Sequence, residues 1–113
     1  MHEFGITQDI LAIALEKAGE AKASRITRIN LVLGELSGIA DECVSFYFEL
    51  ISKDTIASGA DLVIERRPFQ LRCPNCSEAF APAGFDWSCP RCHEPKTEAV
   101  SGRECHMHSI EVE

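Results

Sequence analysis

The stretch that decides the fold contains two cysteine pairs, Cys73-Pro74-Asn75-Cys76 and Cys89-Pro90-Arg91-Cys92. Two residues between the cysteines of a pair let both sulfurs turn toward one metal ion. Twelve residues separate the pairs, enough for a short hairpin that brings the second pair back to complete a tetrahedron. Four thiolates in this geometry select zinc, with iron as the second choice. Because the protein supplies all four ligands, no position is open for catalysis and we expect a structural site.

The length and charge of the chain limit its domain organisation and its classes of partner. A chain of 113 residues forms one domain, or one domain with a small metal module. The formal charge is −7, and four thiolates with one Zn²⁺ would bring it to −9. Nucleic-acid binding needs clustered lysine and arginine, so a nucleic-acid partner is not expected.

The sequence carries no signal for export or for membrane insertion. It has no apolar run of 18 residues, and no basic segment followed by an apolar one at its start. Paired cysteines in a protein that is not exported indicate a metal site rather than disulfides. We therefore predict a cytoplasmic protein with no membrane partner.

Hydrophobic patterning predicts two helices and three strands outside the cysteine-rich segment. Apolar residues recur at helical spacing in 7–18 and 41–51. Alternation predicts a strand over 26–33, ended by a glycine, and further strands follow over 60–67 and 104–112.

The segment 69–96 holds four of the five prolines and all the paired cysteines, so we interpret it as an inserted zinc-ribbon-like module. The remainder, 1–68 and 97–113, would form a discontinuous α/β domain. Two helices on one face of a three-stranded sheet is the economical packing for these elements. The predicted fold class is α+β.

The N-terminus, Met1-His2-Glu3, could itself chelate a metal. Removal of the initiator methionine needs a small second residue, so Met1 should remain in front of His2. The α-amine, the backbone nitrogen of His2 and its imidazole could then close adjacent rings around one ion, with Glu3 supplying a further donor. Nitrogen-rich planar sites suit Ni²⁺ or Cu²⁺. From the residues alone, an inert N-terminus stays open as the alternative.

Taken together, these segments resemble the HypA/HybF family of nickel metallochaperones. The resemblance begins with the Met-His-Glu start and continues through 28–37 (RINLVLGELS) and 55–62 (TIASGADL). Both C-x-x-C pairs and the ending 109–113 (SIEVE) follow in the family's order. The match covers essentially the whole chain, and its joint specificity is much higher than that of any single piece.

Membership implies that the protein holds Ni²⁺ as cargo and delivers it for [NiFe]-hydrogenase maturation. The implied partners are a HypB-type GTPase, the hydrogenase large subunit and, in some organisms, urease accessory proteins. His2 matches the family's nickel ligand, and Met1 and Glu3 match residues that contribute amine or backbone nitrogens. Cys73, Cys76, Cys89 and Cys92 match its structural zinc ligands. The sequence shows no nucleophile paired with a base and no phosphate-binding loop, so we expect no enzyme activity.

Two other classes of function compete with this interpretation. One is a zinc-ribbon adaptor that bridges proteins and has an inert N-terminus. The other is an electron carrier, with iron at the four cysteines or haem at Cys89 and Cys92, which His93 follows as in a haem-attachment motif. Haem attachment would need export and would leave the first cysteine pair without a partner.

Four further residues could bind metal but have ordinary explanations. His106 and His108 alternate on the last predicted strand, where partly buried histidines with hydrogen-bond partners are more common than ligands. Cys43 and Cys105 are expected to be small core residues. The sequence leaves open which nickel enzyme is the target and whether the chain is a monomer or a homodimer, including one that exchanges its last strand.

Overall fold

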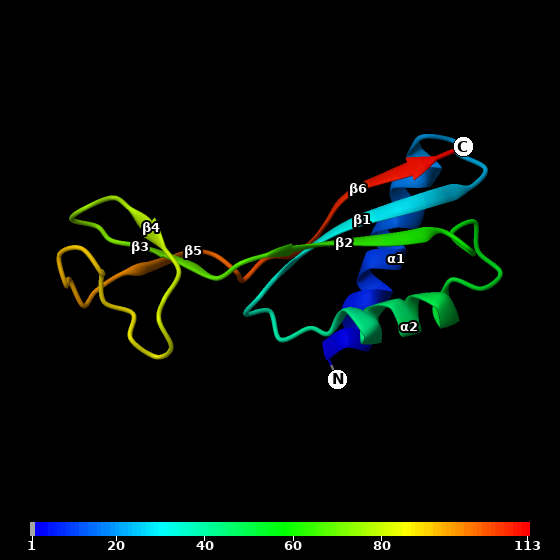
Figure 1. Ribbon diagram of the computed structural model, residues 1–113. Coiled ribbons are helices and arrows are strands. Elements are labelled where there is room, and N and C mark those ends of the chain that lie inside the picture. Colours follow the sequence, from blue (N-terminus) through cyan, green and yellow to red (C-terminus); the bar gives the residue numbers. More distant parts are fainter. Residues whose placement is uncertain (1) are drawn as a thin grey trace. The chain divides into compact units, whose positions relative to one another are not determined.

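The computed structural model describes residues 2–113, apart from the side chain of His2. The elements follow the order α1 (His2–Glu20), β1 (Ile26–Gly34), α2 (Asp41–Ile51), β2 (Asp61–Arg67), β3 (Gln70–Arg72), β4 (Ala79–Phe80), β5 (Glu98–Ser101) and β6 (Cys105–Val112) (Figure 1). They divide into two compact units. Unit 1 comprises the residues up to Val32, Gly38–Glu65 and His106–Glu113, and unit 2 comprises Leu33–Ser37 and Arg66–Cys105.

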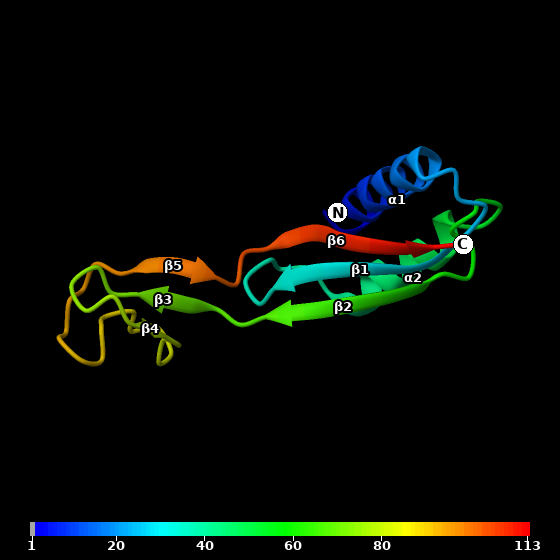
Figure 2. The same ribbon diagram turned by 90° about the horizontal axis from the view of Figure 1, so that it is seen from above.

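Unit 1 is built on the three-stranded sheet β2-β1-β6, with both helices on one face (Figure 2). Ile29 and Leu31 alternate on β1 and are buried, which is the period expected of a strand with a core face. Ala14 of α1 and Val44 and Phe48 of α2 are buried as well. The predicted α+β fold, with two helices over one face of a three-stranded sheet, is therefore confirmed.

The first helix is longer than its hydrophobic pattern predicts, because it begins at His2 rather than at residue 7. In the added turn, the hydroxyl of Thr7 donates a hydrogen bond of 2.5 Å to the carbonyl of Glu3, and Thr7 is fully buried. The ring of Phe4 packs edge-on against Tyr47 of α2, with centroids 5.2 Å apart. Neither helix in residues 2–113 is long and apolar enough to cross a lipid bilayer.

Unit 2 contains the second sheet, ordered β4-β3-β5, with antiparallel pairing on both sides of β3. Leu71 lies at its centre, opposite Phe80 on one side and Ala99 on the other, and is fully buried. None of these three short strands follows from the hydrophobic pattern. The unit extends beyond the predicted module 69–96, because it includes β5 and the turn 33–37.

Two glycines allow close backbone contact within unit 2. A Cβ atom on Gly34 would lie 2.1 Å from the carbonyl of Gly102, too close for any side chain. Gly102 itself has φ +109°, a conformation that favours glycine, and its carbonyl accepts a bond of 2.6 Å from the amide of Leu36. The turn after β1 is thereby fixed against the segment between β5 and β6.

Candidate metal centres

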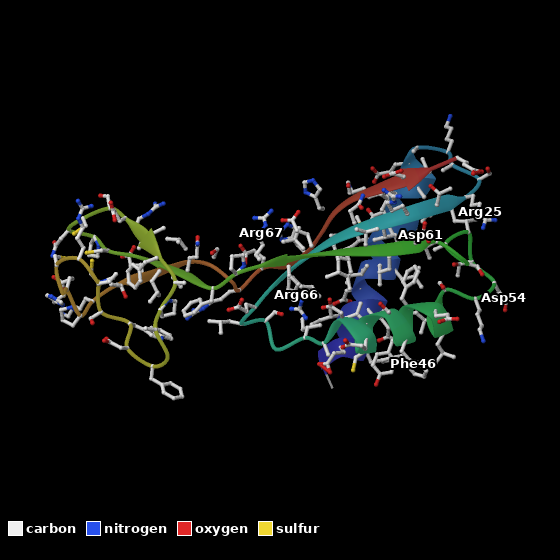
Figure 3. The ribbon with its side chains drawn as sticks, in the orientation of Figure 1. Arg25, Phe46, Asp54, Asp61, Arg66 and Arg67 are labelled. Carbon is white, nitrogen blue, oxygen red and sulfur yellow. The ribbon has the colours of Figure 1, made fainter. Side chains whose placement is uncertain are left out.

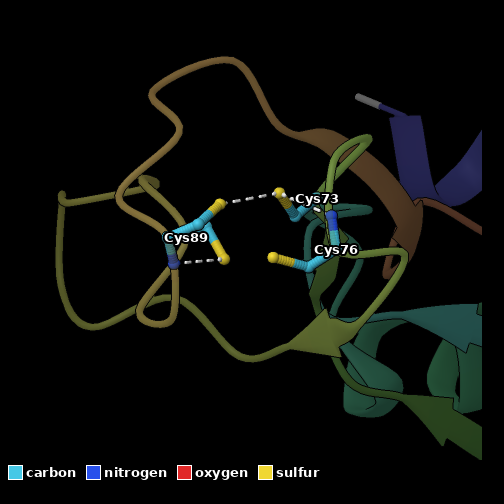
Figure 4. A group of neighbouring side chains, drawn as sticks. Cys73, Cys76 and Cys89 are labelled. Carbon is cyan, nitrogen blue, oxygen red and sulfur yellow. Dashed lines mark hydrogen bonds between the residues drawn. The ribbon is translucent and has the colours of Figure 1, made fainter.

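The four paired cysteines converge at one point in unit 2 (Figure 4). Their sulfurs all lie within 4.8 Å of one another, and the Cys73 and Cys92 sulfurs are 3.5 Å apart. Sulfurs about 2.3 Å from a central zinc ion would be separated by about 3.8 Å in a tetrahedron, so the cluster closely approaches that geometry. Cys73 and Cys89 are buried, whereas Cys92 is exposed. The donor set and its spacing fit zinc.

Each cysteine pair forms the same tight turn. In both turns the amide of the first cysteine donates to the carbonyl five residues later, and its own carbonyl accepts from the amide four residues later. The bonds are Cys73 N to Glu78 O at 3.1 Å, Ser77 N to Cys73 O at 2.8 Å, Cys89 N to Glu94 O at 2.9 Å and His93 N to Cys89 O at 2.9 Å. Ser77 and His93 occupy equivalent positions with φ of 60° and 64°. The two turns are thus structural repeats of one another.

Backbone amides also point at the sulfurs. The amides of Cys92 and Arg91 lie 3.5 Å and 3.4 Å from the Cys89 sulfur, and the Cys76 amide lies 3.5 Å from the Cys73 sulfur. Donation from the Cys92 amide is the main reason that the pKa of Cys89 falls to about 7. The pKa of Cys76 rises to about 12, chiefly through its hydrogen bond with Cys92. A divalent ion would displace the protons that the free thiols share.

Two side-chain bridges connect the turns reciprocally. Asn75 in the first turn donates to Glu94 of the second at 2.7 Å, and Arg91 in the second donates to Glu78 of the first at 2.5 Å. This relation was not predicted from the sequence, although the signal was present as a repeated C-P-x-C-x-E pattern. Each bridge holds one cysteine pair against the other from outside the sulfur cluster.

Removing these bridges should accelerate zinc release without preventing zinc binding. Exposed ion pairs contribute about 0.2–1 kcal/mol, so Glu78→Ala should raise the release rate by about 1.5- to 5-fold. Adding Asn75→Ala should multiply that effect. Transfer of zinc to an excess of a colorimetric chelator measures the rate. Arg28→Ala, which removes the exposed pair of Arg28 with Glu111 in unit 1, is the matched control. Equal rates in the double variant and the control would contradict the prediction.

The predicted nickel site at the N-terminus lies largely outside the described residues. Met1 and the side chain of His2 are not described, so their roles stay predictions. The backbone from His2 onward is helical, and Glu3 is half-buried. The first four amides of a helix have no acceptor inside it, so the helix itself does not engage the backbone nitrogens of His2 and Glu3. A chelate that uses these nitrogens is compatible with the helix.

The remaining candidate ligands do not assemble into a site. His106 and His108 are both exposed on β6, so the expectation of partly buried histidines is wrong. Cys105 is exposed too, which corrects its assignment to the core, while Cys43 is half-buried on α2. Within the part of the chain that the structure describes, the four paired cysteines are the one group of three or more potential ligands close enough to share an ion.

The fold and the cysteine cluster define a small α+β protein with a four-cysteine cluster whose geometry fits zinc. The family model described as "Hydrogenase/urease nickel incorporation, metallochaperone, hypA" matches residues 1–112. The chain therefore belongs to the HypA family, which confirms the resemblance seen in the sequence.

The similarity to known HypA proteins extends over the full length of the chain. A hydrogenase maturation factor HypA from Dehalococcoides mccartyi is 41% identical over 113 residues, covering 100% of this chain and 95% of the relative. That of Caldanaerobacter subterraneus subsp. tengcongensis is 36% identical over 114 residues, covering 100% of both. Among solved structures, a HypA solution structure has a TM-score of 0.78 at 27% identity, covering 99% of this chain and 96% of its own. The Ni metallochaperone HypA from Helicobacter pylori has a TM-score of 0.68 at 26% identity, covering 97% and 96%.

Proposed function

We propose that this protein binds Ni²⁺ at its N-terminus and delivers it for [NiFe]-hydrogenase maturation, with a four-cysteine zinc site that shapes unit 2. The observation that carries the proposal is the match of the metallochaperone family model to residues 1–112, which includes the Met-His-Glu start. The Met1 amine, the His2 imidazole and backbone nitrogen, and a nitrogen of Glu3 form the proposed nickel donor set. Cys73, Cys76, Cys89 and Cys92 form the proposed zinc site.

Delivery requires that the ion leave without becoming free. Donors at a chain end can be replaced one at a time by those of an acceptor, so that a bare ion never forms. The contact of Phe4 with Tyr47 supports this arrangement, because it holds the first turn of α1, which follows the proposed donors in the chain, against α2.

The proposed partners supply what this chain lacks. The sequence has no nucleotide-binding loop, so nucleotide hydrolysis falls to a HypB-type GTPase, and the hydrogenase large subunit receives the nickel. Urease accessory proteins are a further class of recipient. We assign no catalysis to this chain and place the protein in the cytoplasm, as a monomer or a homodimer. The functional division assigns nickel to the α/β domain of 1–68 and 97–113 and zinc to the module of 69–96.

Blocking the α-amine tests delivery directly. We expect the protein with its native N-terminus to transfer radioactive nickel to a purified hydrogenase large-subunit precursor. A variant extended by a few residues before Met1 should transfer only background amounts, while the same extension after Glu113 should have no effect. Equal transfer by the two extended proteins would refute N-terminal delivery and favour the alternative, a zinc-ribbon adaptor without nickel function.

A further inference from the structure

The outer face of α2 carries an apolar pair where a surface helix would ordinarily be polar. Glu42, Ser45, Phe46, Glu49 and Leu50 are all exposed and recur at helical spacing, opposite the buried Val44 and Phe48. Phe46 and Leu50 are separated by one turn and expose 63% and 51% of their surface. Phe46 projects from α2 on the side away from the sheet (Figure 3). We call this pair with its flanking charges the α2 face.

The α2 face also contains a hollow. Phe46, Glu49, Leu50 and Lys53 line a shallow hollow of about 210 Å³ on the surface of unit 1. Aromatic side chains at the centre of such hollows are frequent binding hot spots in protein interfaces. Leucine and phenylalanine one turn apart are also the usual anchors when two amphipathic helices pack together.

The charge around the α2 face selects the kind of partner. Helices α1 and α2 together contain seven carboxylates and one lysine, Lys17, which pairs with Glu20 at 3.7 Å. On the α2 face itself Glu42 and Glu49 are exposed beside Phe46 and Leu50, and Lys53, just after the helix, is the one cation that lines the hollow. Carboxylates therefore outnumber cations around Phe46 and Leu50. By contrast, unit 2 has six lysine and arginine residues and six carboxylates, so its charges balance. Complementarity then requires cationic residues beside the apolar residues of the partner.

We propose that the α2 face is the docking site for a cationic amphipathic helix of a partner protein. The leucine-like side chains of that helix pack on Phe46 and Leu50, and its lysines or arginines lie against Glu42 and Glu49. Phe46 also contacts Tyr47, with ring centroids 5.6 Å apart, and Tyr47 contacts Phe4 at the start of α1. A partner bound here lies beside the N-terminal turn. The docking proposal does not rest on nickel binding, and its test uses no nickel.

A designed peptide provides the test on zinc-loaded, full-length protein. The probe is a helical peptide of about 18 residues, five turns, with leucines at positions i, i+3, i+4 and i+7 flanked by lysines. A second peptide keeps the leucines and replaces every lysine with glutamate. We expect the lysine peptide to bind and to shift the amide resonances of Ser45, Phe46, Glu49 and Leu50. Phe46→Ala should weaken its binding by at least about 10-fold, as expected for an aromatic hot spot.

The chain offers a matched control in Phe85, which is fully exposed in unit 2. Phe85→Ala removes an equally large exposed ring and should leave peptide affinity within about 2-fold of wild type, since most truncations outside a hot spot cost little. Circular dichroism and zinc content check that both variants are folded, and Leu50→Ala provides a second variant on the α2 face. Equal effects of Phe46→Ala and Phe85→Ala, equal binding of the glutamate peptide, or resonance shifts confined to other elements would overturn the proposal. Self-association of the wild type that Phe46→Ala abolishes would also overturn it, by assigning the α2 face to a second copy.

Discussion

Replacing Cys73 by alanine is expected to eliminate zinc binding and to unfold unit 2 while unit 1 stays folded. Cys73 is fully buried, and its sulfur lies 3.5 Å from that of Cys92. Unit 2 contains about 45 residues, close to the size below which a domain usually needs a metal or disulfides. Structural zinc in finger peptides binds with about 10–16 kcal/mol at neutral pH, far more than such a small core can replace.

The effect of Cys73→Ala on folding can be measured separately in unit 1 and unit 2. Metal analysis should give one zinc per wild-type chain and none for Cys73→Ala. In amide NMR spectra the dispersed signals of β3 and β5 should collapse, whereas those of α1 and α2 should persist. Cys105→Ala removes an exposed thiol outside the cluster and should change neither result. A dispersed unit 2 spectrum in the absence of zinc would show that its own packing is sufficient.

The sequence predicted elements best where the hydrophobic pattern is long and regular. The helix at 41–51 has the observed bounds of α2, because buried and exposed positions follow helical spacing throughout. The start of α1 was missed because Gly5 is a poor helix former and no apolar repeat precedes Ile6. Its first turn is instead supported by contacts between elements, such as that of Phe4 with Tyr47. Such contacts leave no periodic signal.

The three strands of unit 2 were unpredictable for a different reason. They contain two to four residues each, which is too short for alternation to be recognised. The pairing of β3 with β5 joins residues about 30 apart in sequence, such as Leu71 and Ala99, and such a distant partner leaves no local signal. Cysteine spacing, by contrast, predicted the convergence of the four sulfurs, because ligand geometry restricts the chain directly. Whether Cys105, His106 and His108 are exposed depends on which other elements cover each face of β6. The spacing of residues in the sequence does not specify this.

The second large effect is expected at the N-terminus, where His2→Ala should abolish specific nickel binding. In the proposed nickel site, the His2 imidazole would close one chelate ring and complete the planar nitrogen set that Ni²⁺ prefers. Replacing residues that only support metal ligands typically costs 10–100-fold in affinity, so loss of a ligand should cost on the order of 100-fold or more.

Calorimetric titration of zinc-loaded, untagged protein measures the effect of His2→Ala. Wild type should bind about one Ni²⁺, and binding should strengthen as pH rises toward the α-amine pKa near 8, because the amine must lose its proton to coordinate. His108→Ala is the matched control, because His108 is an exposed histidine far along the chain. If His2→Ala binds as tightly as wild type and the His108→Ala protein does not, the ligand lies on β6. If all three proteins bind equally, neither His2 nor His108 is a nickel ligand. The nickel site to test is then the cysteine cluster, the one group of three or more potential ligands found together in residues 3–113.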